Sequence, residues 1–560
     1  MALVPGIHPF LTVLSQHAAM TALVLGGLLL SLFYRHFFAR PDELAGMRGP
    51  RNTSLLRGNR DRLNVARTLE WQEMYGRTFK THAMFSMSTL FTSDLTALQH
   101  ILNRDEIYQK APIIRWGLSE MLGRGLLVLE DEEHAKLRRI MSPAFSPSQV
   151  KLLTPLFLDK AMELVAFWSP TNNAGWTQFN VVRGLKAVTL DIIGLAGFGY
   201  NFHALAPGGD GSTGVTALGS AFRALFESSQ TRVMTPVRFL RGVVPGLRNI
   251  LPAPKHAVEA RKAMERVGME LLLSAKRDED GAEDRRDLLS LLVKSNMAES
   301  EGQRLSDEVV VAQIPTFFIA GHETTSTSTA WALRALAAYP EVQSALRSEV
   351  QSLGTDSPSF DTLQGLPYLD HFVREVMRLH APVSFTNRLA MRDDVIPLSK
   401  DGAWTDVNGV VHESIIVKKG QNIQVPIGAV NRDRTIWGAD ADEFRYISFH
   451  AHLDLLKRGM SRPERWASPL PAGAASVPGV YSHQLTFLGG PHNCIGWRFS
   501  LAEMKSLLFV LVRELEFALP DGWTADDIVP ASNAAVQRPM LRARPEEGTQ
   551  LPLRVRRIGV

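Results

Sequence analysis

The longest helical pattern in this chain runs from Ser306 to Tyr339, and it constrains the fold more than any other feature. Ser306 can cap the helix, acidic residues follow it in the first turn, and Tyr339-Pro340 ends it. The pattern covers roughly 30 residues, or about 45 to 50 Å at 1.5 Å per residue. A helix of this length crosses a whole domain, so the other elements must pack around it.

The middle of this helix is unusual, because small and hydroxyl residues replace packing hydrophobes in AGHETTSTST, residues 320 to 329. Ser and Thr compete for backbone carbonyls, and Pro315 removes a backbone donor one turn earlier, so we expect a local kink. Two interpretations stay open on these residues alone. One is a buried polar face that is satisfied within the helix. The other is a notch for a flat cofactor, with an acid and an alcohol beside it for proton delivery.

The rest of the chain indicates one large, mainly helical domain with minor sheet. Helical periodicity dominates from about residue 94 to 380, including a helix over 366–380, and a largely apolar helix covers about 498–514. Strand character is confined to a segment at 78–87 and to 414–427. The predicted fold class is therefore mainly α with small β-sheets, an α+β arrangement.

Composition excludes several classes of protein. Cys494 is the only cysteine among 560 residues, so neither an internal disulfide nor a cysteine-rich zinc site can form. The formal charge of +4 is mildly basic, and no run of Lys or Arg with interleaved aromatics indicates nucleic-acid binding. A basic face for an acidic protein partner or an anionic cofactor stays open.

An apolar segment near the N-terminus predicts a membrane anchor. Residues 18–34 read AAMTALVLGGLLLSLFY without a charge, and FLTVLS at 10–15 extends the apolar stretch upstream. No Lys or Arg precedes it and arginines follow from Arg35 onward, which places the remainder in the cytosol. A cleaved signal peptide would need a basic start and a small-residue cleavage site, and both are missing. We therefore predict an anchor at 1–40 and a folded domain at 41–560.

Cys494 lies in FLGGPHNCIG, residues 487 to 496, a loop rich in Gly and Pro. A lone cysteine can be buried filler, a nucleophile or a metal ligand, and filler is the commonest use. A filler role does not explain Gly490 and Gly496. Glycines allow unusual backbone conformations and let the chain approach a bulky group closely. Backbone amides around such a turn can point at the sulfur and stabilise a thiolate. A nucleophile would need a base beside it, which His492 is poorly placed to supply. Ligation by a single thiolate fits haem, which brings its own four equatorial ligands.

FLGGPHNCIG resembles the F-x-x-G-x-R-x-C-x-G loop of the cytochrome P-450 family of haem-thiolate monooxygenases. AGHETT is similar to that family's oxygen-activating A/G-G-x-D/E-T-T motif, EVMR (375–378) to its E-x-x-R motif, and PERW (463–466) to its meander motif. HAKLRRIMSPAFS (134–146) is similar to the stretch that holds its W-x-x-x-R helix. The motifs occur in the family's order behind an anchor, and the resemblance, closest to microsomal fungal members, covers about residues 45 to 540.

The resemblance implies the P-450 fold, with the long helix over the haem, and a role for each matching residue. Cys494 would be the axial ligand of the haem iron, and Glu323 with Thr324 would hold and protonate dioxygen during its activation. A buried structural triad would support the cysteine loop, formed by Glu375, Arg378 and Arg465. The cofactor-binding residues would be Cys494, Arg138, Arg388, His492, His134, Phe487, Gly490 and Gly496, of which the arginines and histidines would meet the haem propionates.

The implied reaction is the insertion of one oxygen atom of O2 into a C–H or C=C bond of a lipophilic substrate. The implied cofactor is haem b (iron protoporphyrin IX), with electrons from NADPH delivered by a membrane-bound NADPH-cytochrome reductase rather than by NADPH bound to this chain. We expect a single-pass protein of the endoplasmic reticulum membrane whose haem-thiolate catalytic domain, 41–560, lies in the cytosol. A terpenoid or steroid-like substrate in secondary metabolism, or xenobiotic oxidation, fits the fungal type.

Two other classes stay open: a haem-thiolate isomerase or dehydratase, against which the intact Glu323-Thr324 pair argues, and a membrane-anchored haem-binding protein without turnover. The sequence also departs from the family pattern. His492 stands where the family usually has Arg, and His134 where it usually has Trp. Residues 446–462 interrupt the usual F-R-P-E-R-W run, and either a retained intron or a real surface loop explains them.

Overall fold

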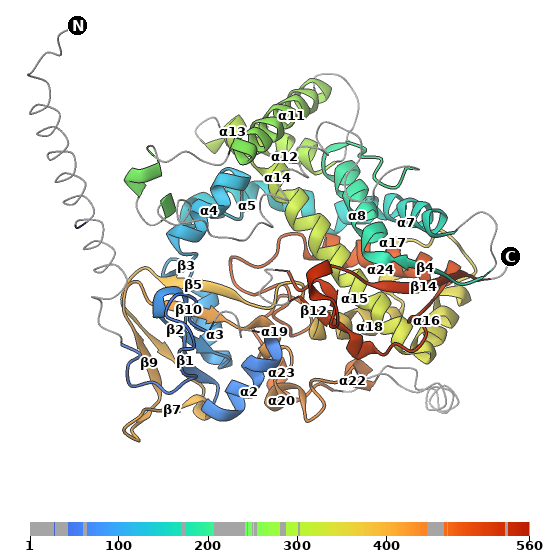
Figure 1. The fold of residues 1–560 in the computed structure, drawn as a ribbon. Helices are drawn as coiled ribbons and strands as arrows, with labels where there is room; N and C mark the ends of the chain where they lie inside the picture. Colours follow the sequence, from blue (N-terminus) through green and yellow to red (C-terminus); the bar gives the residue numbers. More distant parts are fainter. Residues whose placement is uncertain are drawn as a thin grey trace, which may run out of the picture.

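A long helix runs diagonally through the middle of the molecule in this computed structural model, with other helices and small sheets around it (Figure 1). The structure describes Gly27 and residues 43–59, 64–169, 175–206, 241–242, 245–248, 250, 255–279, 287–300, 303–444, 464–467, 469–531 and 536–558. The predicted anchor, apart from Gly27, and the extra stretch at 446–462 lie outside the described residues. No helix within the described ranges is long and apolar enough to cross a membrane.

The predicted long helix is present as four consecutive segments: α13 (Asp307–Val311), α14 (Gln313–Phe317), the π-helical turn η6 (Phe318–His322) and α15 (Glu323–Ala338). It begins after Ser306 and ends at Tyr339, as the sequence predicts, although the Ser306 side chain makes no capping hydrogen bond. The predicted kink is the π turn, which inserts one extra residue into the helix and is frequent at functional sites.

Hydroxyl side chains in and after the widened turn donate to helix carbonyls. Thr324 Oγ1 donates to the Ala320 carbonyl at 2.6 Å, and Ser328 Oγ donates to the Thr324 carbonyl at 3.1 Å. Thr329 Oγ1 donates to the Thr325 carbonyl at 2.9 Å. Each of these bonds competes with the helix for a backbone carbonyl, which is the mechanism that the sequence indicates.

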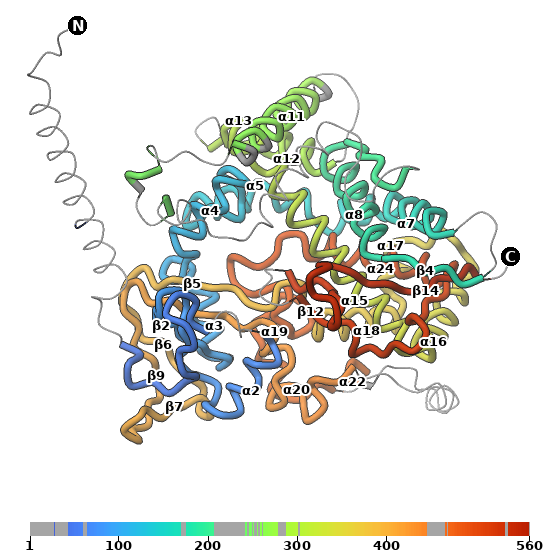
Figure 2. Tube along the Cα trace, in the orientation of Figure 1, coloured from blue at the N-terminus to red at the C-terminus, as the bar shows by residue number. Residues whose placement is uncertain are grey.

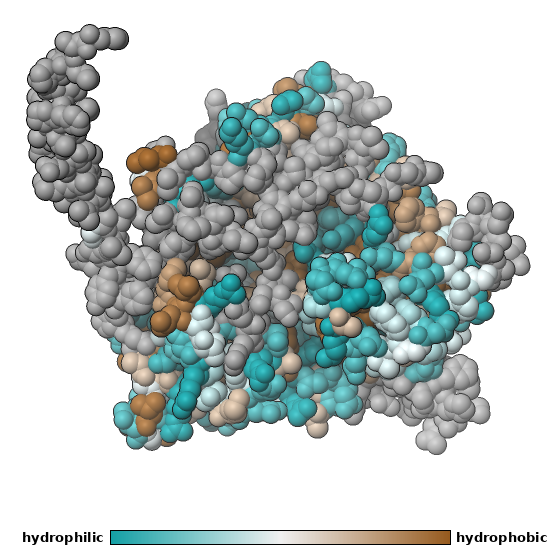
Figure 3. Space-filling model, in the orientation of Figure 1, coloured by the Kyte–Doolittle hydropathy of each residue, from teal (hydrophilic) through white to brown (hydrophobic). Residues whose placement is uncertain are grey.

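The main hydrophobic core surrounds this helix. Its partners include α7 (Thr154–Trp168), α8 (Val181–Phe198) and α24 (Trp497–Glu514), all of which carry long buried faces. From Thr325 to Leu333 every residue of α15 is buried. A helix that is buried on all sides lies at the centre of its domain. The described surface in one view is mostly hydrophilic, with small separate hydrophobic patches (Figure 3).

The largest sheet brings together segments that are far apart in the sequence. Its strand order is β1 (Thr78–His82), β2 (Ser88–Thr92), β10 (Asn422–Val425), β5 (Thr386–Ala390) and β3 (Tyr108–Gln109), and only β10 and β2 pair in parallel. Ile423 of β10 pairs with Leu90 of β2 on one side and with Arg388 of β5 on the other. Figure 2 shows the N-terminal strands beside those of the last third of the chain. The pairing fixes Arg388 on a central strand.

The remaining elements have the following bounds. The other helices are α2 (Val65–Tyr75), α3 (Leu95–Asn103), α4 (Pro112–Leu122), α5 (Asp131–Met141), α6 (Pro147–Leu152), α11 (Lys255–Glu279), α12 (Leu288–Met297), α16 (Pro340–Ser352), α17 (Phe360–Gln364), α18 (Pro367–Leu379), α19 (Ile427–Val430), α20 (Arg434–Trp437), α22 (Glu464–Ala467) and α23 (Ala472–Ala475). The strands are β1 (Thr78–His82), β2 (Ser88–Thr92), β3 (Tyr108–Gln109), β4 (Thr177–Asn180), β5 (Thr386–Ala390), β6 (Asp394–Pro397), β7 (Trp404–Thr405), β8 (Val411–His412), β9 (Ser414–Val417), β10 (Asn422–Val425), β11 (Leu515–Ala518), β12 (Ile528–Pro530), β13 (Pro539–Leu541) and β14 (Pro552–Arg557).

Candidate active site

The cysteine loop has a backbone that only some residues permit. Gly490 has φ +69°, and a Cβ atom at this position would lie 2.1 Å from the carbonyl oxygen of Leu102. Glycine is therefore required there, both for its conformation and for its close approach to α3. The backbone N–H of Cys494 donates to the carbonyl of Phe487 at 2.9 Å, which closes the loop. Gly496 has φ −89°, so the expectation that it needs a glycine-specific conformation is wrong.

The Cys494 side chain is exposed, although protein atoms surround its thiol. Burial nevertheless raises the pKa of its thiol, whereas the Gly496 amide and the Arg138 guanidinium act to lower it. A side chain is both accessible and desolvated when it borders an internal opening rather than the outer surface. The amide and the cation stabilise a thiolate, as expected for a sulfur that binds metal.

Arg138 binds the cysteine loop directly. It projects from α5, and its Nη1 and Nη2 atoms donate to the main-chain and side-chain oxygens of Asn493 at 2.7 and 2.6 Å. Asn493 Nδ2 in turn donates to the Gly490 carbonyl at 2.7 Å. The arginine thus holds the residue before Cys494 in place. Its predicted contact with a propionate stays a prediction.

The widened turn of the long helix is less buried than the helix that follows it. Ala320 is exposed and Thr324 is half-buried, although the residues that follow in α15 are buried. The Thr324 hydroxyl donates to the Ala320 carbonyl within this turn. The exposed Ala320 beside this alcohol agrees with the predicted notch, whereas the bonds from the hydroxyls to helix carbonyls agree with a polar face that is satisfied within the helix. A flat cofactor at the notch stays a prediction.

Glu323, which precedes Thr324, is buried and held by two cations from distant elements. Arg538 Nη2 forms an ion pair with Glu323 Oε1, and Lys186 Nζ of α8 lies 3.8 Å from the same oxygen. Burial lowers the pKa of Lys186, and the Glu323 charge acts in the opposite direction. The acid of the acid-alcohol pair is therefore an anchored carboxylate, and Thr324 carries the hydroxyl at the notch.

The three residues of the predicted triad lie in contact. Arg378 Nη2 and Nε donate to the two Glu375 oxygens at 2.8 and 3.0 Å, and Arg465 Nε donates to Glu375 Oε1 at 3.2 Å. Trp466 Nε1 adds a fourth donor at 3.1 Å. Glu375 and Arg378 are 2% and 0% exposed. Burial raises the pKa of Glu375, but Arg378 and Arg465 outweigh it, so the net shift is downward and the carboxylate is ionised.

A chain of hydrogen bonds connects this triad with the cysteine loop. Arg378 Nη1 donates to the carbonyl of Asn431 at 2.8 Å. Asn431 then receives the Leu485 N–H at 2.9 Å and donates to Thr486 Oγ1 at 2.8 Å. Thr486 immediately precedes Phe487, where the cysteine loop begins. The triad thus supports the cysteine loop through a continuous chain of paired polar groups.

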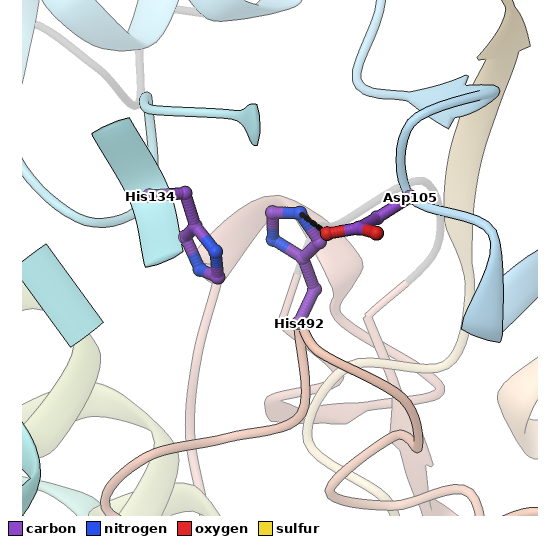
Figure 4. Close-up of side chains that lie close together, drawn as sticks. All are labelled: Asp105, His134 and His492. Carbon is purple, nitrogen blue, oxygen red and sulfur yellow. Dashed lines mark ion pairs between the residues drawn. The ribbon is translucent and has the colours of Figure 1, made fainter. Parts of the chain in front are cut away.

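His492 and His134 form a stacked pair, with ring centroids 3.8 Å apart and ring planes 25° apart. Figure 4 shows His134 on one side of the His492 ring and Asp105 on the other. His492 Nε2 lies 2.9 Å from Glu130 Oε2 and 3.7 Å from Asp105 Oδ2. Because Nε2 faces carboxylates, a propionate would have to meet this ring at Nδ1. The predicted propionate contact of His492 stays a prediction.

Burial and neighbouring charges shift the pKa values of Glu130 and His134. Burial raises the pKa of Glu130, but the hydrogen bond from His492 and the Lys110 ammonium outweigh it and lower the pKa to about 2. Burial, with the His492 charge, lowers the pKa of His134 to about 3, so that ring is neutral near pH 7. Arg388 is buried too, and its Nη1 donates to Thr386 Oγ1 at 3.1 Å.

These positions fit a haem. The thiol that would bind the iron faces inward, and the turn of the long helix with small residues and an alcohol is less buried than the helix that follows it. The cationic groups predicted for the propionates, Arg138 and Arg388, are both desolvated, which lowers their pKa values. Desolvated cations of this kind are suited to bind carboxylates.

Sequence reasoning missed several residues of the site. Lys186 and Arg538, which hold Glu323, and Glu130, which holds His492, carry no motif and are distant from their partners in the chain. Two other residues could have been found from the sequence, because they lie beside or within a recognised motif. Asn493 adjoins the cysteine, and Trp466 lies within PERW.

Comparisons with known proteins agree with this geometry. The family model described as cytochrome P-450 matches residues 47–541. Cytochrome P-450 monooxygenase 205 of Postia placenta is 43% identical over 535 residues, which cover 92% of this chain and 93% of that protein. Cytochrome P-450 monooxygenase 128 of the same fungus is 40% identical, with the same shares covered. Cytochrome P-450 monooxygenase claO of Ampulloclitocybe clavipes is 33% identical over 93% of this chain and 94% of that protein. The chain therefore belongs to the cytochrome P-450 family and is a monooxygenase of that family.

Proposed function

We propose that this monooxygenase oxidises a lipophilic small molecule of terpenoid or steroid-like type in fungal secondary metabolism, with electrons that a reductase takes from NADPH. The observation that carries the catalytic part is the inward-facing Cys494 thiol, which the Gly496 amide and the Arg138 charge favour as a thiolate. The apolar residues Ile319 and Ala320 at the notch support a lipophilic substrate. The fungal origin of the three relatives supports a fungal-type member.

Haem, when bound, supplies the iron chemistry that activates dioxygen, and the residues of this chain position and protect it. Cys494 would hold the iron, and Arg138 and Arg388 would hold the propionates. Once Thr324 Oγ1 no longer donates to the Ala320 carbonyl, it would donate its proton toward the dioxygen substrate. The Glu323 carboxylate, fixed by Lys186 and Arg538, would accept a hydrogen bond from a bridging water and orient it, and that water would replace the proton that Thr324 gives up.

The test is a turnover assay of the full chain with a reductase, NADPH and isotopically labelled dioxygen, over a panel of terpenoids, steroids and fatty acids. We expect one labelled oxygen atom in the product of at least one lipophilic compound. Product that forms without NADPH would instead favour an isomerase or dehydratase. Haem-loaded protein that gives no product from any compound would contradict the proposed substrate class.

Replacing Thr324 with Ala should uncouple NADPH consumption from product formation. The product formed per NADPH should fall roughly tenfold or more, since a positioned proton donor contributes roughly 10²- to 10⁴-fold to a rate. Thr324→Ser is the matched control, because it keeps the hydroxyl at the same carbonyl, and it should retain most of the coupling. Both ratios are measured with the substrate found above. Equal coupling in wild type and Thr324→Ala would remove Thr324 from the proton path.

We also propose that residues 1–40 anchor the chain in the endoplasmic reticulum membrane, with the catalytic domain in the cytosol. The apolar sequence at 18–34 and the arginines that follow it support this placement. In a fungal host, the full chain should stay in the membrane fraction after an alkaline carbonate wash. Protease added to intact microsomes should digest the catalytic domain. Release by carbonate, or protection from protease, would contradict the anchor or its orientation.

A further inference from the structure

Glu503 is a buried acidic residue that the mechanism above does not use. It lies on α24, the helix that begins three residues after Cys494, and it is 1% exposed. Both of its carboxyl oxygens are fully buried without a hydrogen-bond partner that meets the usual geometry among the described residues. No cation contributes to its ionisation in that part of the chain. Such a group is rare in a folded protein and calls for an explanation.

A carboxylate in this environment cannot keep its charge. Desolvation of an unpaired ion is so unfavourable that the group takes up a proton instead. Burial accordingly raises the pKa of Glu503 well above its ordinary value, while the nearby Thr325 hydroxyl acts in the opposite direction. The other strongly buried acids described above each have a cation beside them, an arginine at Glu375 and Glu323 and Lys110 at Glu130. Glu503 differs because it has none.

The polar neighbours of Glu503 connect the two helices of the active site. Thr325 follows Thr324 on α15, and Thr325 Oγ1 lies 3.1 Å from Ser500 Oγ of α24. Ser500 lies six residues after Cys494. Thr325, Ser500 and Glu503 therefore form a small polar cluster in an otherwise apolar contact between two helices. One is α15, which carries Thr324, and the other is α24, which begins three residues after Cys494.

We propose that Glu503 is a protonated positioning residue whose O–H donates to Thr325 Oγ1, so that the Thr325 hydroxyl donates onward to Ser500. In this arrangement Thr325 Oγ1 and Ser500 Oγ each accept one hydrogen bond, and Glu503 carries no buried charge. It fixes α15 against α24, and hence Thr324 against Cys494. The positioning of Thr324 against Cys494 rests on the proposed function, because it assumes that a haem lies between these two residues.

The protonation state is tested by infrared difference spectroscopy of the full chain. Wild type minus Glu503→Gln should contain the carbonyl band of a protonated carboxylic acid, and that band should persist at neutral and mildly alkaline pH. Thr325→Val should shift the band, because it removes the acceptor of the O–H. The absence of a protonated-acid band, or a band that Thr325→Val leaves unchanged, would overturn the assignment. This readout requires neither haem nor turnover.

The positioning role is tested with the carbon monoxide complex of reduced, haem-loaded protein. Glu503→Gln, a neutral side chain of the same shape that can still donate, should match the wild-type spectrum. Glu503→Leu should convert part of the red-shifted thiolate band to the band of a thiol-ligated haem. A wild-type spectrum in Glu503→Leu would overturn the positioning role. If that variant does not fold, Thr325→Val provides the same comparison. Loss of the red-shifted band in wild type itself would count against the proposed function instead.

Discussion

Replacing Cys494 with Ser should abolish monooxygenase activity while leaving the fold intact. A serine hydroxyl fits the space of the thiol and can receive the same Gly496 amide, so the loop keeps its shape. It does not ionise at neutral pH, however, and without a thiolate the electron push that favours O–O cleavage is lost. Product formation should fall to the level of the assay without enzyme. Activity is measured with the substrate identified above, and folding by circular dichroism and thermal unfolding.

The matched control for this change is Ile495→Val, one residue further along the same loop. It removes one methylene from a partly buried side chain and should cost about 0.5 to 1.5 kcal/mol of stability without loss of activity. If Cys494→Ser keeps substantial activity, the cysteine is not the axial ligand. If Ile495→Val also loses all activity, the loop responds to any disturbance and the comparison does not isolate the thiolate.

The second large effect is expected at Arg378. Arg378→Leu removes two donors from the fully buried Glu375 carboxylate and one from the Asn431 carbonyl. Breaking a buried ion pair on one side destabilises a protein by about 3 to 5 kcal/mol, because the remaining charge has lost its partner. The bonds from Asn431 to Leu485 and Thr486 should loosen as well, so haem retention should fall together with stability.

Arg67→Leu on α2 is the matched control for Arg378→Leu. Arg67 pairs with Glu70 at the same spacing of three residues, but the two side chains are 48% and 52% exposed. An exposed pair of this kind contributes about 0 to 1 kcal/mol. Urea unfolding and haem content are measured for both variants. Equal stability losses in Arg378→Leu and Arg67→Leu would contradict the central role assigned to the buried triad.

Local features of this site could be predicted from the sequence because they follow from spacing along the chain. The long helix from Ser306 to Tyr339 and its kink follow from periodicity and from hydroxyl residues that compete for carbonyls, and both predictions are confirmed. Glu375 and Arg378 lie one helical turn apart, so their contact could be expected, and the structure also places Arg465 beside them. The resemblance to a family supplied what spacing could not, namely that these motifs belong to one site.

The remaining features depend on tertiary packing, which no local pattern encodes. Lys186 and Arg538 meet Glu323 only because α8 and the segment before β13 pack on the long helix. Glu130 faces His492 for a similar reason. The conformation of Gly496 was predicted wrongly, since a glycine in a loop does not by itself reveal its φ angle. The sequence predicts a class of substrate but not the individual compound, because residues 94–130 and 215–250, where substrate contacts are expected, carry no motif.

The most direct test of the central claim is the difference spectrum of the full chain, reduced and exposed to carbon monoxide, after expression with haem available. A thiolate-ligated haem gives a strongly red-shifted Soret band, because sulfur donates electron density to the iron. We expect this band in wild type, with no such band in Cys494→Ser. Folded wild-type protein that contains haem but lacks the red-shifted band would contradict the assignment of Cys494 as the axial thiolate.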